Sequence, residues 1–210
     1  MLITFATLMQ QFKMNVTGVL HIGAHECEEL KAYNGKGVTN VYWVEAMQEK
    51  VDLMKSRGIQ NIFQAVIDEE DGKSVTFNIT NNGQSSSILE FGSHAKSHPQ
   101  VHVTKRVPLI TSRMDTLIEQ NNIPINTLNF INLDIQGVEL RALKSMEKHL
   151  NTVDYIYTEV NTEEVYKGCD QMSEIDAYLS TFDFQRVNQN IYKQFGWGDA
   201  IYIRKSKIVA

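Results

Sequence analysis

Cysteine, proline and an excess of positive charge are all missing or scarce in this sequence of 210 residues. Two cysteines, Cys27 and Cys169, are too few for a disulfide framework, and neither belongs to a CxxC pair, which disfavours a structural zinc site. The net charge of -5 leaves no basic footprint for nucleic acid or for an anionic membrane. We therefore expect a small molecule or a glycan as partner, no nucleic acid, and a reducing, cytoplasmic location.

A hydrophobic run long enough to cross a bilayer is also lacking. The apolar first segment, MLITFATLMQQFKM, has no basic region and no small-residue cleavage site, and it is too short to span a membrane. We interpret residues 1–17 as an amphipathic helix packed on the domain; membrane attachment through Phe5, Leu8 and Phe12 is the less favoured alternative. With only three prolines and no repeat or linker, residues 18–210 are expected to form one domain. The oligomeric state stays open.

What the sequence does contain is an alternation of short apolar runs and helical patterns. Three runs, at residues 19–22, 41–44 and 61–67, have the β-branched and aromatic content of parallel strands buried on both faces. Helical patterns follow the first two runs, at residues 26–33 and 47–58. This order predicts right-handed crossovers and a doubly wound α/β sheet.

The alternation of strands and helices is interrupted once in the rest of the chain and then resumes. Two alternating strands are expected at residues 72–80 and 101–111, around a polar loop at 81–99. Further elements are expected as helix 112–122, strand 127–135, helix 138–150, strand 153–160, helix 172–182, and strands 182–188 and 198–205. The last two strands favour an antiparallel edge pair.

The turn after the first strand, GAHECEE, is a candidate ligand site, because open α/β sheets bind ligands at the carboxyl ends of their strands. Gly23 is the one glycine present of the three in a dinucleotide fingerprint. Glu26, Glu28 and Glu29 are expected in the first turn of a helix, where their charge would repel a phosphate. The pattern favours a ligand with an ammonium or sulfonium group, although Glu28 and Glu29 can also be helix-stabilising surface charges.

Two more carboxylates stand at predicted strand ends. Glu45, about twenty residues beyond Gly23, is placed to accept hydrogen bonds from both ribose hydroxyls of a nucleoside. Its alternative role is a cap for the next helix. Asp68 is placed to reach an adenine amino group, or else belongs to an acidic turn with residues 69–71.

The strand expected at 127–135 ends at Asp134, which can bind an amino group, act as a general base, hold a metal, or cap the next helix. Glu159 lies at the end of the next strand and Asn161 directly after it, and together with Asp134 they would offer Mg²⁺ a set of oxygen ligands. Oxygen ligands at strand ends are common by chance, so the interpretation without a metal is preferred.

Three histidines recur at every fourth position, His94, His98 and His102. Pro99 breaks any helix that would align them, and no acidic or cysteine partner is spaced to complete a zinc site. We interpret them as loop residues that can contribute to a lid over the substrate. The aromatic residues between 192 and 197 can be rim contacts or core packing.

The ordered set LHIGAHECEE, VYWVEA, AVIDEEDG, SSSI, RMDTLI, INLDIQGVELRAL, YTEV and WGDAIYIR resembles the FkbM-type methyltransferases, a branch of the class I S-adenosylmethionine-dependent fold. The resemblance covers residues 18–204. Its most specific part is the family pattern K-x-D-x-E-G-x-E-x-x-V/A-L, which Asp134, Gly137, Glu139 and Leu143 match.

The resemblance implies a mostly parallel seven-stranded sheet with an antiparallel C-terminal edge pair, and S-adenosylmethionine as cofactor. It also implies O-methylation of a sugar, a glycan or another small hydroxyl acceptor, with His25, Asp134 and Glu159 as candidates for the base. The cofactor-binding residues would be Gly23, Ala24, His25, Glu45, Ala46, Ile67, Asp68 and Asp134.

Several departures from the family pattern stand out. His21 replaces an aspartate, Cys27 a glycine, Asn132 a lysine and Gln136 a glutamate, and residues 46–47 are Ala-Met where the family has Pro-Asn. The changes at His21, Asn132 and Gln136 keep open the alternative of a non-catalytic cofactor- or glycan-binding relative. A nicotinamide-dependent oxidoreductase is less favoured, because the glycine-rich pyrophosphate loop is missing.

Overall fold

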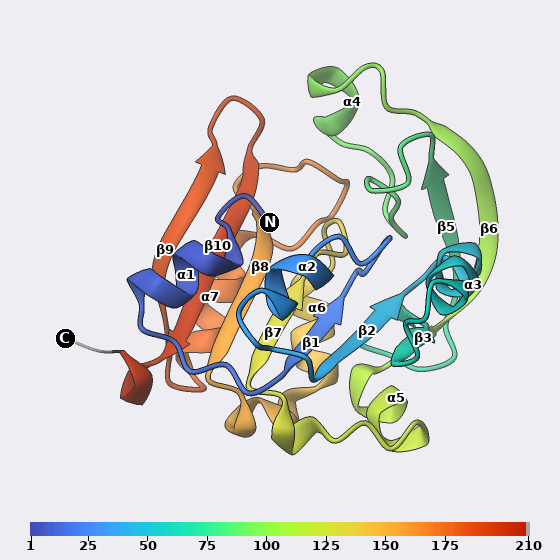
Figure 1. Cartoon of the computed structure of the whole chain (residues 1–210). Coiled ribbons are helices and arrows are strands. Elements are labelled where there is room, and N and C mark those ends of the chain that lie inside the picture. Colours follow the sequence, from blue (N-terminus) through green and yellow to red (C-terminus); the bar gives the residue numbers. More distant parts are fainter. Residues whose placement is uncertain (209–210) are drawn as a thin grey trace.

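The computed structural model describes residues 1–208, which form a central sheet with helices on both faces (Figure 1). Seven strands make up this sheet, in the order β3-β2-β1-β7-β8-β10-β9. They are β1 (Val19–Ile22), β2 (Val41–Glu45), β3 (Ile62–Gln64), β7 (Phe130–Leu133), β8 (Tyr155–Asn161), β9 (Phe184–Tyr192) and β10 (Trp197–Arg204). β10 is antiparallel to both of its neighbours, and the other pairs are parallel. The predicted doubly wound, mostly parallel seven-stranded sheet with an antiparallel C-terminal edge pair is confirmed.

Two groups of helices bury the two faces of the sheet. On one face lie α1 (Phe5–Gln11), α2 (Leu30–Asn34) and α3 (Gln48–Ser56), and on the other α5 (Met114–Gln120), α6 (Glu139–Ser145) and α7 (Met172–Ser180). Short 3₁₀ turns occupy Ile125–Thr127, Glu147–Thr152 and Lys205–Lys207. Each helix contributes an apolar stripe to its core, for example Val51 and Met54 of α3. No helix among residues 1–208 has both the length and the apolar character needed to cross a bilayer.

The first helix is shorter than the segment expected at residues 1–17. The side chain of Thr4 accepts a hydrogen bond from the backbone N–H of Thr7 and caps α1, which ends at Gln11. Phe5 and Leu8 are fully buried, and the ring of Phe5 packs edge-on against Tyr33 and Phe130. These side chains are therefore part of the core, not a face left free for a membrane.

A second sheet of three strands stands beside the first, in the order β4-β6-β5. It consists of β4 (Val66–Ile67), β5 (Ser74–Thr80) and β6 (Val103–Ser112), with α4 (His94–Ser97) in the long connection between β5 and β6. The single strand expected at 61–67 is wrong, because β3 and β4 belong to different sheets. Gln64 pairs with Glu45, the last residue of β2, so pairing in the main sheet ends there and the chain turns to β6.

The helix expected at 26–33 is also placed wrongly. His25 and Cys27 have φ values of 44° and 55°, which no right-handed helix accommodates, and α2 begins only at Leu30. Glu26, Glu28 and Glu29 therefore precede the helix and do not occupy its first turn.

Candidate active site

One cavity of about 460 Å³ opens where the carboxyl ends of β1, β2, β7 and β8 meet. Residues from each of these strand ends line the cavity, among them Gly23, Glu45, Asp134 and Glu159. β1 lies between β2 and β7, and its four residues are buried, so the ends of these strands have fixed positions. The cavity stands at the place where open α/β sheets bind their ligands.

The turn after β1 depends on a glycine. The backbone N–H groups of Gly23 and Ala24 both donate to the carbonyl of Val44, which ties the turn to β2. Gly23 has φ of +90°, and a Cβ there would lie 1.7 Å from the backbone oxygen of Asp134. Only a residue without a side chain lets the ends of β1 and β7 approach this closely.

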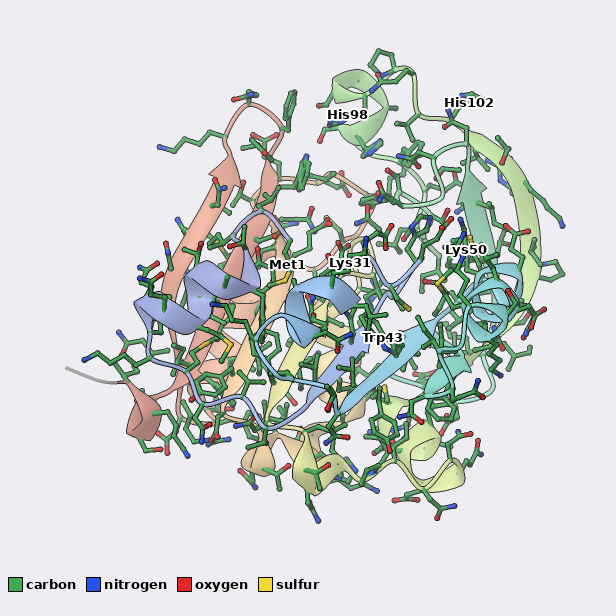
Figure 2. All side chains as sticks on the ribbon, in the orientation of Figure 1. Met1, Lys31, Trp43, Lys50, His98 and His102 are labelled. Carbon is green, nitrogen blue, oxygen red and sulfur yellow. The ribbon has the colours of Figure 1, made fainter. Side chains whose placement is uncertain are left out.

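The rest of this turn is held by polar contacts. Glu28 Oε1 lies 2.6 Å from His25 Nδ1, and Glu28 Oε2 accepts the N–H of Glu26. Burial alone would raise the pKa of Glu28, but these hydrogen bonds outweigh it and hold the pKa at about 2. Glu26 forms a salt bridge of 2.6 Å with Lys50 of α3, and neither residue lines the cavity (Figure 2).

Cys27 lies behind the turn and has no chemical role that its surroundings favour. It is a free cysteine, 4% exposed, in the core under α2. Burial and nearby carboxylates raise the pKa of its thiol to about 12, so it stays protonated.

Glu45 presents a buried carboxyl group to the cavity. It is 5% exposed and accepts the backbone N–H of His25 at 2.7 Å and that of Met47 at 2.9 Å, one on each oxygen. Burial raises the pKa of Glu45, and the two N–H donors act in the opposite direction. The carboxyl group thus fixes the β1 turn against the start of α3, and its remaining lone pairs face the cavity.

Asp134 and Glu159 are joined by one amide. Gln136 Nε2 donates to Asp134 Oδ1 and to Glu159 Oε2, each at 2.6 Å. Gln136 Oε1 accepts the hydroxyl hydrogen of Tyr166, which fixes the direction of the amide. Asp134 is exposed and Glu159 is buried. Burial, followed by the charge of Asp134, raises the pKa of Glu159 well above its usual range, which favours the protonated form of Glu159.

A fully buried glutamate shapes the turn between β7 and α6. Glu139 accepts the N–H groups of Ile135 and Gly137, and burial raises its pKa to about 8. Gly137 has φ of +105°, and a Cβ there would come within 2.9 Å of Cys169. These two residues of the family pattern are thus structural supports for the Asp134 turn.

A neutral polar chain forms part of the cavity wall, because His21 and Asn132 both line the cavity. Asn132 Nδ2 donates to the hydroxyl of Tyr33 at 2.8 Å, and that hydroxyl lies 3.2 Å from His21 Nδ1. Burial lowers the pKa of His21, so its imidazole is uncharged at neutral pH. The ring of Trp43 stacks on His21.

Most residues expected at the site do line the cavity: Gly23, His25, Glu45, Ala46, Ile67, Asp134 and Glu159. Two do not. Ala24 is buried behind the turn. The Asp68 carboxyl accepts the N–H of Glu69 and lies 3.6 Å from Lys73 Nζ, away from the cavity.

The arrangement does not support the Mg²⁺ alternative. The Gln136 amide already donates to Asp134 and Glu159 at the place a cation would take, and Asn161 does not line the cavity. Among residues 1–208, no group of three or more His, Cys, Asp or Glu residues is placed to hold a metal.

Several lining residues were not identified from the sequence. Met47, Val66, Phe77 and Ile88 form an apolar corner next to Glu45, and Ser85 and Ser86 border it. Val66 and Phe77 come from the second sheet, and no local pattern indicates that this sheet folds over the first. Tyr166, the partner of Gln136, follows β8 in a loop without a recognisable motif.

Comparisons with known proteins agree with this geometry. The family model described as "Methyltransferase FkbM domain" matches residues 19–186. No curated protein sequence matches the chain.

Solved structures with a similar fold are methyltransferases. An S-adenosylmethionine-dependent methyltransferase from Clostridium acetobutylicum has a TM-score of 0.50 and 8% identity over 95% of this chain and 89% of its own. Magnesium protoporphyrin IX methyltransferase from Synechocystis has a TM-score of 0.46 and 8% identity over 89% of this chain and 69% of its own. At such identities the similarity concerns the fold alone. The family match, in contrast, covers most of the sequence, and the chain belongs to the FkbM methyltransferase domain family.

Proposed function

We propose that this chain is an S-adenosylmethionine-dependent methyltransferase that methylates a hydroxyl group of a sugar, a glycan or another small acceptor. The observation that carries the proposal is the buried carboxyl group of Glu45, which lines the cavity at the end of β2 beside the β1 turn. Family membership and this position support one another, because an acidic residue here is the usual partner of ribose hydroxyls.

The residues of the cavity fit the proposed cofactor. Glu45 would hold the ribose, and the apolar corner of Met47, Val66, Phe77 and Ile88 would hold the adenine ring. Six carboxyl groups line the cavity, and no lysine or arginine side chain among residues 1–208 does. A nucleoside with an ammonium and a sulfonium group suits this charge, whereas the pyrophosphate of a nicotinamide cofactor would meet repulsion.

When bound, the cofactor supplies a positively charged, electrophilic methyl group. The chain's own part is to align the acceptor hydroxyl and to remove its proton. Among the three candidate bases we propose Asp134, because it is exposed in the cavity. Burial and the charge of Asp134 favour the protonated form of Glu159, and His25 is engaged by Glu28. Gln136 would keep the Asp134 carboxylate aimed at the cavity.

Calorimetry with S-adenosylhomocysteine tests cofactor binding. We expect the wild-type protein to bind and Glu45→Gln to bind about tenfold or more weakly, because the amide NH₂ group cannot accept a ribose hydroxyl hydrogen and a buried polar group left unsatisfied costs roughly 1 to 3 kcal/mol. Glu49→Gln, an exposed change on α3, is the matched control and should bind as the wild type does. Absence of wild-type binding at millimolar concentration would refute the proposal.

Transfer of a radiolabelled methyl group to a panel of hydroxyl acceptors tests catalysis. Asp134→Asn should lower kcat by about 100-fold or more while the affinity for S-adenosylhomocysteine changes little. Cofactor binding without transfer to any acceptor would favour the non-catalytic relative instead.

A further inference from the structure

The cavity extends well beyond the residues proposed for the cofactor. Glu45 stands at the end of β2, and Trp197, another lining residue, begins β10. β1, β7 and β8 lie between these two strands, and neighbouring strands are about 4.8 Å apart, so the two ends of the cavity are roughly 19 Å from each other. The β10 end therefore lies well apart from the residues proposed for the ribose and the adenine ring.

Rings of four residues line this end, and we call them the shelf: His94, His98, Tyr166 and Trp197. The imidazoles of His94 and His98 stack with their centroids 4.9 Å apart, and His94 lies 5.5 Å from Tyr166. Trp197 lies 6.5 Å from His98. Phe91 stacks on His94 at 4.4 Å and His98 covers the other side of that ring, so the rings that the shelf can offer for stacking are those of Tyr166 and Trp197.

The shelf also carries polar atoms that have no partner. His94 Nδ1, His98 Nδ1 and Trp197 Nε1 are buried and make no hydrogen bond to any described residue. His94 is only 7% exposed, and burial, reinforced by His98, lowers its pKa to about 4, so its ring is neutral. Buried polar atoms without partners are unfavourable, and three of them on one wall indicate a place for a ligand with hydrogen-bonding edges.

Hydrogen bonds connect the shelf to Asp134, the proposed base, and to Glu159. The hydroxyl of Tyr166 donates to Gln136, whose amide donates to Asp134 and Glu159. A ring that lies on the shelf is therefore next to Asp134, the proposed base.

The negative charge of the cavity limits which acceptors can bind on the shelf. Of the six lining carboxyl groups, Glu29 is offset by the α-ammonium of Met1 at 3.4 Å, and burial raises the pKa values of Glu45, Glu159 and Asp199. Glu28 and Asp134 keep the balance negative, with no lysine or arginine side chain among the described lining residues to oppose them. A phosphate or carboxylate on the acceptor would be repelled.

We propose that the shelf of His94, His98, Tyr166 and Trp197 is the acceptor subsite, and that it takes an uncharged sugar ring and rejects phosphorylated, nucleotide-linked and uronic acid sugars. This inference rests on the proposed methyltransferase function. A sugar ring matches the shelf because it has an apolar face for the rings of Tyr166 and Trp197 and hydroxyls on its edge for the three ring nitrogens. A purely aromatic acceptor would leave those nitrogens unpaired.

Ligand-detected NMR on protein saturated with S-adenosylhomocysteine tests the subsite with simple sugars in place of the natural acceptor. The probes are methyl glycosides of glucose, galactose, mannose and N-acetylglucosamine, with glucose 6-phosphate, glucuronate and a nucleoside diphosphate glucose as anionic counterparts. We expect at least one glycoside to bind and its anionic counterpart to bind about tenfold more weakly, as repulsion across roughly 10 Å predicts. Matching disaccharides distinguish a free sugar from a chain end.

Variants connect the binding to the shelf. Trp197→Ala and His98→Ala should weaken glycoside binding by up to about tenfold, the range for lost ring stacking, while the affinity for S-adenosylhomocysteine is unchanged. Trp197→Phe should retain part of the glycoside affinity that Trp197→Ala loses. His102, which lies farther along the same segment toward β6 and is exposed, gives the control His102→Ala (Figure 2).

Three results would overturn the inference: anionic sugars that bind as well as neutral ones, no glycoside binding by protein that binds S-adenosylhomocysteine, or glycoside binding that the shelf variants leave intact. Failure to bind S-adenosylhomocysteine would instead count against the proposed function itself.

Discussion

Replacing Gln136 by glutamate tests whether its amide joins two carboxyl groups. In the wild-type protein, Asp134 and Glu159 each place an oxygen 2.6 Å from Gln136 Nε2. Gln136→Glu replaces the donor by a third carboxyl group, which must hold a proton of its own to donate to Asp134 even where Glu159 is protonated. Glutamic acid in an unfolded chain has a pKa near 4.3, so holding that proton costs about 4 kcal/mol at pH 7.5 and about 1.6 kcal/mol at pH 5.5.

The direction in which the destabilisation changes with pH follows from proton binding. The folded variant holds a proton that its unfolded chain releases above pH 4.3, so the destabilisation grows as the pH rises. Relative to the wild type, thermal unfolding should show a Tm lower by about 10 °C at pH 7.5 and by only a few degrees at pH 5.5. Gln136→Leu, which removes the amide without adding an acid, should show a much weaker pH dependence. A Tm loss for Gln136→Glu that is equal at the two pH values, or absent at pH 7.5, would refute the bridging role.

Two further outcomes are expected. Gly23→Ala places a Cβ 1.7 Å from the Asp134 backbone oxygen, so it should lower the Tm by about 10 °C or more and abolish S-adenosylhomocysteine binding. The control Gly37→Ala, also at positive φ but with no atom near its Cβ, should cost only about 1 kcal/mol, and an equal effect of both would contradict the close-approach argument. For His94, whose folded pKa is about 4, the unfolded imidazole takes up a proton below pH 6.5 that the folded one does not. The contribution of neutral His94 to the free energy of unfolding is therefore fully present above pH 6.5. The free energy of unfolding falls by up to about 3 kcal/mol toward pH 4, which urea unfolding would measure. His94→Phe should lack this loss, and a variant that retains all of it would assign the loss to another group.

The sequence was sufficient for the main sheet because its strands are buried on both faces and so form continuous apolar runs. Val19 to Ile22 needs no distant partner to be recognised as a central strand. Residues 61–67 look the same locally, yet they serve two sheets, because the partner changes after Gln64. That change is set by β6, some forty residues away along the chain, and no local pattern carries it.

In the candidate site, too, the features that depend on the local sequence were predicted and those that depend on distant parts of the chain were not. Glu45 and Asp134 were identified because a carboxylate at a strand end has a position fixed by the sheet itself. The φ values of His25 and Cys27 were not expected, since non-glycine residues seldom adopt them. Asp68 has the same sequence context as Glu45, but it follows β4, which has left the main sheet, so its carboxyl group faces Lys73 instead of the cavity.

Pairing across strands also accounts for two of the departures from the family pattern. His21 on β1 stands opposite Asn132 on β7, and these positions hold an aspartate and a lysine in the pattern. Changing either one alone would leave a buried charge without its partner, which typically costs about 3 to 5 kcal/mol. Here both charges are replaced together by neutral groups, and the hydroxyl of Tyr33 joins them by hydrogen bonds. The two departures therefore act as one compensated change in the cavity wall, which keeps Glu45 and Asp134 among its other lining residues.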